Sequence, residues 1–133
     1  MNIAIVGIGL IGGSIAIRLR ETNFFTKIIG VDKSEANQKK ALQLNLVDEV
    51  MSLEEAIQQA KGILLTTPVD VIMKLAPAIL DQIEDQVLID MGSTKINILQ
   101  HIAAHPKRGR YVAAHPMAGT EYSGPEAAIP NLF

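Results

Sequence analysis

A glycine-rich turn near the start of the chain is the first group of residues whose types and spacing could do chemistry. It reads Gly-Ile-Gly-Leu-Ile-Gly at residues 7–12 and directly follows the apolar run 3–6. In this pattern the first glycine permits a tight turn, the second lets the backbone approach a pyrophosphate, and the third brings the next helix close to the strand. The helix N-terminus offers amide donors and a positive dipole to phosphates. The candidate cofactor-binding residues of this turn are Gly7, Gly9, Leu10, Ile11 and Gly12.

Asp32 indicates which dinucleotide the turn would hold. It ends the second apolar run, about 20 residues beyond Gly12, where an acidic residue receives the adenine ribose hydroxyls. A carboxylate accepts hydrogen bonds from a 2′-hydroxyl but repels a 2′-phosphate, so NAD is favoured over NADP. Lys33 beside it leaves the strictness of that preference open. The alternative is a structural role for Asp32, either as a solvated strand end or as part of a helix cap with Ser34.

Polar residues also follow two later apolar runs. Thr67, in Leu-Thr-Thr-Pro-Val at 65–69, would contact the ribose or nicotinamide, or would only cap the next helix. Ser93, in Asp-Met-Gly-Ser-Thr-Lys at 90–95, is either a helix N-cap or a substrate ligand. Asp90 is expected to be a structural carboxylate that accepts hydrogen bonds from loop amides rather than a catalytic base.

His115 is the candidate for proton transfer. It lies just past the expected strand Arg110–Ala113, and imidazole is the side chain best suited to take a proton near neutral pH. The alternative is a structural histidine bonded to a loop carbonyl. His101 is expected in a helix and His105 in a turn. The three histidines have unsuitable spacing for a zinc site and there is no cysteine, so no metal is expected.

A parallel sheet would bring these strand ends to one edge. Apolar runs alternate with helical patterns, which predicts an α/β fold with a doubly wound parallel sheet, a Rossmann-type dinucleotide-binding domain. The expected strands are Ile3–Val6, Lys27–Asp32, Glu49–Met51, Gly62–Thr66, Gln86–Asp90 and Arg110–Ala113. The expected helices are Gly12–Glu21, Glu35–Leu44, Leu53–Ala60, Val69–Ile83 and Thr94–Ala103. Ser34 and the pair Ser52 and Glu55 predict helix caps, and Pro77 predicts a kink or a restart.

Composition limits the class of partner. With 133 residues, of which 48% are hydrophobic, the chain suits one domain with a core. A net charge of −2 favours a small-molecule substrate over nucleic acid, and the charged stretch 105–110 is expected to be a solvated turn. The absence of cysteine fits a reducing compartment, so a cytoplasmic protein is expected. The uncharged segment 3–17 lacks a basic flank and is shorter than the roughly 20 residues of a membrane span, so no membrane association is expected.

Three motifs together resemble the N-terminal domain of the prephenate/arogenate dehydrogenase family. They are Gly-Ile-Gly-Leu-Ile-Gly-Gly-Ser at 7–14, Asp-Met-Gly-Ser-Thr-Lys at 90–95 and His-Pro-Met-Ala-Gly-Thr-Glu-Tyr-Ser-Gly-Pro-Glu-Ala at 115–127. The resemblance implies NAD-dependent oxidative decarboxylation of prephenate to 4-hydroxyphenylpyruvate in tyrosine biosynthesis, or the matching reaction of arogenate. It implies that His115 bonds the ring hydroxyl, that Ser93 positions that hydroxyl and the nicotinamide, and that Glu121 joins the polar network at the cleft. Lys95 matches the motif without an assigned role.

Members of this family continue beyond the point that matches Phe133, into more sheet and a helical domain that supplies dimer contacts. We therefore expect residues 1–133 to be the dinucleotide-binding domain alone, inactive by itself, within a full-length homodimer. One alternative is a dehydrogenase or reductase of another hydroxy or imino acid, which would not carry the loop at 115–121 in this form. Another is a non-catalytic NAD-sensing module, which would leave Ser93, His115 and Glu121 without a purpose.

Overall fold

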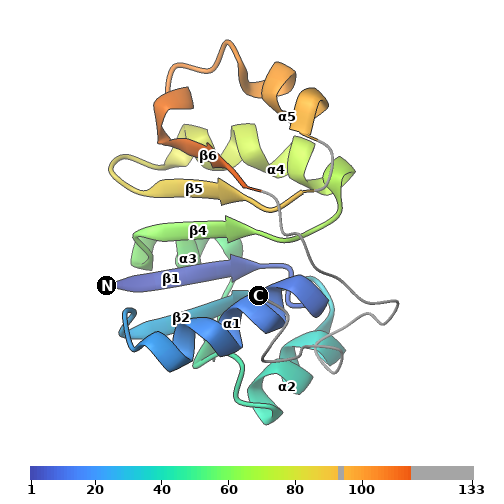
Figure 1. Cartoon of the computed structure of the whole chain (residues 1–133), viewed down its shortest axis with the longest axis vertical. Coiled ribbons are helices and arrows are strands. Elements are labelled where there is room, and N and C mark those ends of the chain that lie inside the picture. Colours follow the sequence, from blue (N-terminus) through green and yellow to red (C-terminus); the bar gives the residue numbers. More distant parts are fainter. Residues whose placement is uncertain (93–94, 115–133) are drawn as a thin grey trace.

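A parallel sheet forms the centre of the computed structural model, which describes residues 1–92 and 95–114 (Figure 1). Within those residues the strand order is β3-β2-β1-β4-β5-β6, with every neighbouring pair parallel. The strands are β1 Asn2–Val6, β2 Lys27–Val31, β3 Glu49–Val50, β4 Gly62–Leu65, β5 Val87–Asp90 and β6 Tyr111–Ala113. The chain winds outward from β1 to β3 and then crosses to β4 on the other side of β1. This confirms the predicted doubly wound, Rossmann-type fold.

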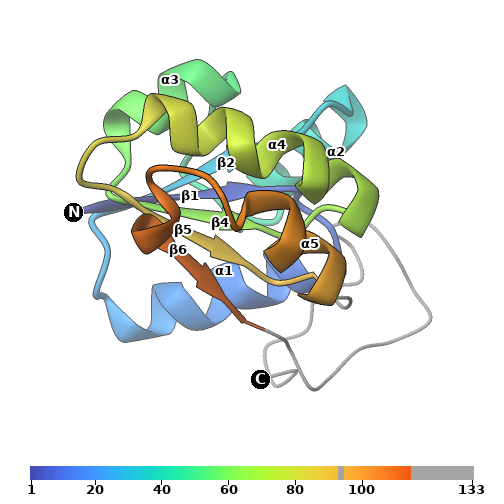
Figure 2. The same ribbon diagram turned by 90° about the horizontal axis from the view of Figure 1, so that it is seen from above.

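Helices cover both faces of the sheet, as Figure 2 shows for α1 on one side and α3 and α4 on the other. The helices are α1 Leu10–Thr22, α2 Glu35–Gln43, α3 Leu53–Gln59, α4 Val69–Gln82 and α5 Lys95–Ile102, followed by a short 3₁₀ helix, Arg108–Arg110. Side chains of successive strand residues point to opposite faces. Ile3 and Ile5 accordingly pack with α1 and α2, whereas Ala4 and Val6 pack with α3, α4 and α5. Burial on both faces explains why the strands are continuous apolar runs.

Two of the predicted caps are present. Ser34 is the N-cap of α2, and its Oγ accepts a hydrogen bond from Asn37 N at 3.2 Å. Ser52 is the N-cap of α3, and its Oγ accepts from Glu55 N at 3.2 Å. Each bond satisfies one of the amides that the first turn of a helix leaves without an intrahelical partner.

One predicted helix start was wrong, and one of the two alternatives predicted at Pro77, the restart, is excluded. Helix α1 begins at Leu10 rather than Gly12, because Gly9 is the N-cap and the turn is shorter than expected. Helix α4 runs through Pro77 without a restart. A proline inside a helix costs about 3 kcal/mol. Buried side chains on both sides of it, including Ala76 and Ile79, hold the helix against the sheet and outweigh that cost.

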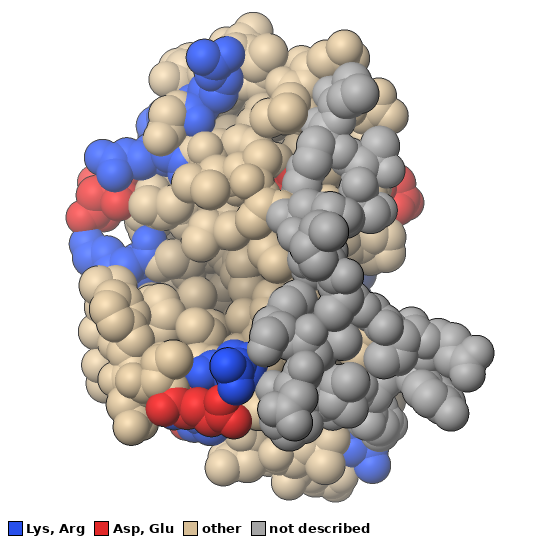
Figure 3. Space-filling view, viewed as in Figure 1, with Lys and Arg blue, Asp and Glu red and all other residues tan. Residues whose placement is uncertain are grey.

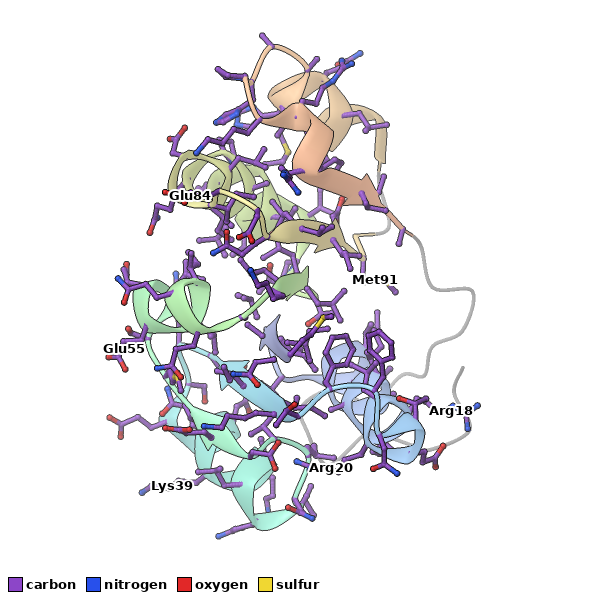
Figure 4. All side chains as sticks on the ribbon, turned by 90° about the vertical axis from the view of Figure 1, so that its left-hand side faces the viewer. Arg18, Arg20, Lys39, Glu55, Glu84 and Met91 are labelled. Carbon is purple, nitrogen blue, oxygen red and sulfur yellow. The ribbon has the colours of Figure 1, made fainter. Side chains whose placement is uncertain are left out.

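Some charged side chains form ion pairs, among them Arg18 with Glu21 and Lys27 with Glu49. On the face shown in Figure 3, acidic side chains at the left and lower left lie beside basic ones, whereas the upper left carries basic side chains alone. At the edge where the strands begin (Figure 4), Arg20 of α1 donates to Asn45 O at 2.9 Å and to Asp48 Oδ1 at 3.0 Å. This interaction fastens the end of α1 to the loop between α2 and β3.

The described helices include none that is both long and apolar enough to cross a membrane.

Candidate functional site

The glycine turn has the geometry that its sequence predicts. Gly7 has φ +95°, a left-handed conformation that side chains rarely tolerate, and its N–H donates to Val31 O at 2.8 Å. A Cβ at Gly7 would lie 2.8 Å from Thr67 Cγ2. A Cβ at Gly12 would collide with the carbonyl oxygen of Gly7. The turn therefore needs glycine at both positions, the first for its φ angle and the second for the close approach of α1 to β1.

The N-terminus of α1 points its amides toward this turn. Its N-cap is Gly9, which contributes no side-chain hydrogen bond, and the helix begins with Gly13 N donating to Gly9 O at 2.9 Å. The N–H groups of a first helical turn need partners, and together with the helix dipole they favour an anion. A glycine cap leaves the space beside them clear for a phosphate group.

Asp32 stands at the end of β2 beside the glycine turn. Its Oδ2 accepts from Ile8 N at 2.9 Å and from Asn37 Nδ2 at 3.4 Å, and its Oδ1 accepts from Ser34 N at 2.9 Å. The structural role at the α2 cap is therefore present, whereas the contact with the adenine ribose stays a prediction for a residue that lines the candidate site. A carboxylate has about four acceptor positions, so three donors leave capacity for a ribose hydroxyl.

A cavity of about 970 Å³ joins these groups. Its size is in the range of pockets that hold small molecules and cofactors. Polar groups of the turn, the β2 end and the β4 end line one part, and apolar side chains of β3, α3 and α4 line another. The lining residues that bear on a nucleotide are Gly7, Gly9, Asp32, Lys33, Thr66, Thr67, Met51 and Val71. Such a mixture suits a ligand with a charged phosphate part and a flat apolar base.

Thr67 does not cap the following helix. The N-cap of α4 is Pro68, which makes no side-chain cap bond. Within the described parts of the chain, Thr67 Oγ1 is buried and has no hydrogen-bond partner. Buried hydroxyls nearly always have a partner, so an orphaned one in the wall of a cavity is typical of a ligand contact. The capping alternative was wrong, and the ligand-contact alternative remains.

A bound dinucleotide would fit the glycine turn and the start of α1, where Gly9 gives no side-chain cap bond. It would also fit the remaining acceptor capacity of Asp32 and the buried Thr67 hydroxyl. The sequence model of the family described as "Prephenate dehydrogenase, nucleotide-binding domain" matches residues 15–133. That match covers most of the chain. This chain belongs to that family.

Relatives in the prephenate dehydrogenase family match this chain over nearly its whole length. Prephenate dehydrogenase of Bacillus subtilis is 36% identical, with the match covering 99% of this chain and 37% of the relative. Cyclohexadienyl dehydrogenase of Zymomonas mobilis is also 36% identical, over 99% of this chain and 46% of the relative. The chain thus spans less than half the length of these two relatives.

The fold is also close to that of a solved family member. The crystal structure of Aquifex aeolicus prephenate dehydrogenase in complex with hydroxyphenyl propionate and NAD⁺ has a TM-score of 0.87 and 31% identity. The superposition covers 100% of this chain and 47% of that one. The Rossmann-type sheet described above is therefore the N-terminal fold of this family.

The strand ends that lead to the other predicted site residues lie side by side. Ser93, His115 and Glu121 lie outside the described residues, as does the side chain of Lys95. Strand β5 ends at Asp90 and pairs with β6 in the register Asp90 to Ala113. Ala114 N donates to Asp90 O at 2.8 Å and so continues this pairing beyond β6.

Asp90 is the structural carboxylate that the sequence predicts. It is fully buried, and its Oδ1 accepts from Gly92 N at 2.6 Å. Its Oδ2 accepts from the hydroxyl of Tyr111 at 2.5 Å, a partner that the sequence analysis missed. Burial, followed by the hydrogen bond to Asp90 and its negative charge, raises the pKa of Tyr111 well above its usual value. This pair joins the turn before residue 93 to the strand that leads to residue 115.

Proposed function

We propose that residues 1–133 form the NAD-binding domain of a prephenate or arogenate dehydrogenase. The observation that carries this proposal is the contact between the glycine turn and Asp32, at the mouth of a cavity large enough for a dinucleotide. Membership of the prephenate dehydrogenase family supports the reaction class. The reaction removes a hydride from the substrate ring and releases the ring carboxylate as carbon dioxide. For prephenate the product is 4-hydroxyphenylpyruvate.

The described residues would bind the cofactor in two parts. Backbone amides of the turn and the first residues of α1, from Gly7 to Gly12, would hold the pyrophosphate. Asp32 would accept hydrogen bonds from the adenine ribose hydroxyls, and Thr67 would supply its hydroxyl to the nicotinamide half. When bound, NAD supplies the nicotinamide ring that accepts the hydride.

The substrate side would depend on three residues for which the sequence is the guide. His115 would accept the proton of the ring hydroxyl, Ser93 would orient that hydroxyl, and Glu121 would complete the polar network. Their placement after β5 and β6 supports this, because ligands of open parallel sheets bind beyond the carboxyl ends of the strands. We expect the full-length protein to be a cytoplasmic homodimer that acts on a small molecule.

Arogenate is a second candidate substrate, because the chain is also similar to a solved arogenate dehydrogenase. The crystal structure of Synechocystis arogenate dehydrogenase has a TM-score of 0.83 and 33% identity, over 100% of this chain and 47% of that one. This likeness is similar to that of the prephenate dehydrogenase structure. Steady-state rates of the full-length enzyme with prephenate and with arogenate, measured by the absorbance of NADH, show which of the two is the substrate. Absence of turnover with either would contradict the proposed reaction.

Nucleotide preference tests the cofactor part of the proposal directly. Calorimetric titration of this chain should show measurable NAD binding and at least several-fold weaker NADP binding, because the Asp32 carboxylate repels a 2′-phosphate. In an Asp32→Asn variant, which lacks the negative charge, the difference in affinity between NAD and NADP should become smaller. Equal affinities of the unchanged chain for NAD and NADP would remove the role given to Asp32.

A further inference from the structure

Thr66 makes two kinds of hydrogen bond at the end of β4, next to the glycine turn. Its N–H donates to Val6 O at 2.9 Å and continues the pairing of β4 with β1. Its hydroxyl lies 2.5 Å from Gly7 O and 3.0 Å from Val6 O. A hydroxyl has one hydrogen to donate, and the nearer acceptor is the carbonyl of Gly7. The backbone N–H of Thr66 already makes the hydrogen bond that pairs β4 with β1. The side-chain hydroxyl therefore contributes a second, different contact, to the glycine turn.

The role of this contact becomes clear from the peptide that joins Gly7 to Ile8. A trans peptide is planar, and its C=O and N–H point in opposite directions. The carbonyl of this peptide accepts from Thr66, and its N–H donates to Asp32 Oδ2 at 2.9 Å. One rigid unit is therefore held at both ends, by β4 on one side and by the end of β2 on the other. Rotation of this peptide would break both bonds together.

The side chain of Ile8 anchors the same peptide in a third direction. It is fully buried in the cluster formed by β1, β2 and α1. Its Cδ1 lies over Gly30 of β2, where an added Cβ would come within 2.5 Å of it. Gly12 of α1 also lies against this peptide, since a Cβ there would collide with Gly7 O and come within 2.7 Å of Thr66 Oγ1. Together with these contacts, the hydrogen bond from the Thr66 hydroxyl to the Gly7 carbonyl holds the peptide in place.

We propose that Thr66 is a positioning residue for the dinucleotide site. Its hydroxyl fixes the Gly7–Ile8 peptide, and through the N–H of that peptide it fixes the carboxylate that would receive the adenine ribose. Thr66 acts through the turn and through Asp32, and not through its own contact with the ligand. The inference rests on the proposed NAD binding and assigns to Thr66 an effect on the affinity for NAD.

Thr66→Val tests the inference because valine matches threonine in shape and lacks the hydroxyl. The variant keeps the backbone bond to Val6, so it is expected to fold. NAD affinity, measured by calorimetry on the whole chain, should fall roughly three- to tenfold, the worth of one neutral hydrogen bond. ADP-ribose, which lacks the nicotinamide, should lose affinity by the same factor. Thr66→Ser keeps the hydroxyl and should bind close to the unchanged chain.

Thr22→Val is the matched control. Thr22 also donates its hydroxyl to a backbone carbonyl, that of Leu19 at 2.8 Å, but at the far end of α1. This variant loses the same kind of bond away from the turn, so NAD affinity should not change. An equal loss of affinity in both variants would show a general effect on stability and would overturn the inference.

Amide hydrogen exchange of Ile8, measured without nucleotide, separates positioning from direct contact. Loosening the peptide should speed this exchange in Thr66→Val and leave it unchanged in Thr66→Ser and Thr22→Val. Unchanged Ile8 exchange, or unchanged NAD affinity in Thr66→Val, would overturn the inference. If the unchanged chain fails to bind NAD, the proposed function fails, while the exchange experiment still decides whether Thr66 holds the peptide. Should Thr66→Val not fold, Thr66→Ala carries the same comparison.

Discussion

The pair of Asp90 and Tyr111 shows how one buried carboxylate can organise two neighbouring chain segments. Asp90 accepts from the Gly92 amide on its own side and from the Tyr111 hydroxyl across the strand pair. Gly92 fits closely here, because an added Cβ would lie 2.9 Å from Asp90 Oδ1 and 3.0 Å from Ile72 Cδ1. A buried charge needs hydrogen bonds to compensate for lost hydration. The two donors therefore fix the carboxylate, and the carboxylate fixes the turn.

Titration of Tyr111 checks this pair. Its pKa is raised in the folded state, above the value of about 10 for an unfolded chain. The hydroxyl thus stabilises the fold fully below pH about 10, and that contribution is lost as the pH rises toward the folded pKa. In Tyr111→Phe the free energy of unfolding should be lower by about 1–2 kcal/mol at neutral pH. The difference from the unchanged chain should shrink above pH 10, as chemical denaturation across this range would show.

Absorbance of tyrosinate provides the control for that experiment. The chain has two tyrosines, so in a Tyr122→Phe background only Tyr111 reports. Titration of this single tyrosine at its ordinary pKa would show that its hydroxyl is not bonded to Asp90.

The proposed role of His115 predicts a specific kinetic defect. If neutral imidazole accepts the hydroxyl proton, His115→Asn in the full-length enzyme should lower kcat by roughly 10²–10⁴-fold, the usual worth of a positioned general base. A group that acts in the transition state lowers kcat and kcat/KM together, so KM should change little. Steady-state kinetics across pH should also show that the acidic limb of the profile disappears. Near-normal kcat, or loss of NAD binding along with activity, would make His115 a structural residue.

Single residues differ in how far the sequence alone reveals their role. The need for glycine at Gly7 and Gly12 could be predicted because their spacing belongs to a local motif with a known mechanical basis, and the same motif predicts the role of Asp32. Thr66 and Tyr111 could not, because each acts on a residue that is distant in the chain, and only the sheet brings them together. Thr67 was left between two roles. The orphaned hydroxyl decides against capping, and no sequence pattern carries that information.

At the scale of elements, the approach of α1 to β1 depends on Gly12. A methyl group there would meet the Gly7 carbonyl and lie 3.1 Å from Ile5 Cγ2. Gly12→Ala should therefore push the helix from the turn, lower the free energy of unfolding by roughly 1–3 kcal/mol, and weaken NAD binding at least tenfold. Denaturation and calorimetry measure the two effects.

Gly109→Ala, in the 3₁₀ helix Arg108–Arg110, is the matched control for the Gly12→Ala substitution. A Cβ at Gly109 would meet nothing within 4 Å, so stability should change by less than about 0.5 kcal/mol and NAD affinity should stay the same. A Gly12→Ala variant that behaves like this control would show that α1 has room to accommodate the methyl group.

The existence of each strand and α-helix followed from the sequence more readily than its ends did, whereas the 3₁₀ helix at Arg108–Arg110 was expected only as a turn. The caps at Ser34 and Ser52 were predicted because side chains mark them. The start of α1 was misplaced because a glycine cap leaves no side-chain signal at Gly9. The helix predicted over Pro77 is present, but the restart is not, because burial of the surrounding apolar face favours a continuous helix. Tertiary packing, which a local pattern does not contain, decided that case.

For the whole molecule, the crossover from β3 to β4 is what creates the site. It separates the chain into two halves that diverge from β1, and the cavity opens where the order reverses. Alternating strands and helices predicted a parallel sheet, and the known handedness of such crossovers limits the order of the strands. The residues that line it come from the ends of β1, β2 and β4, from β3, and from the helices α2, α3 and α4. A nucleotide bound at this point would therefore tie both halves together.

This arrangement predicts that NAD stabilises the entire chain against heat. A ligand that binds only the folded state at about 100 times its Kd adds about 2.7 kcal/mol. For a domain of this size that corresponds to a rise in Tm of roughly 10 °C in a calorimetric scan. NADP at the same concentration should give a smaller rise, because Asp32 disfavours the 2′-phosphate. In Gly12→Ala the rise with NAD should be small, since the helix start no longer presents its amides to the pyrophosphate. If NAD raises the Tm of Gly12→Ala as much as that of the unchanged chain, the nucleotide binds away from the glycine turn, and the proposed site at the crossover is wrong.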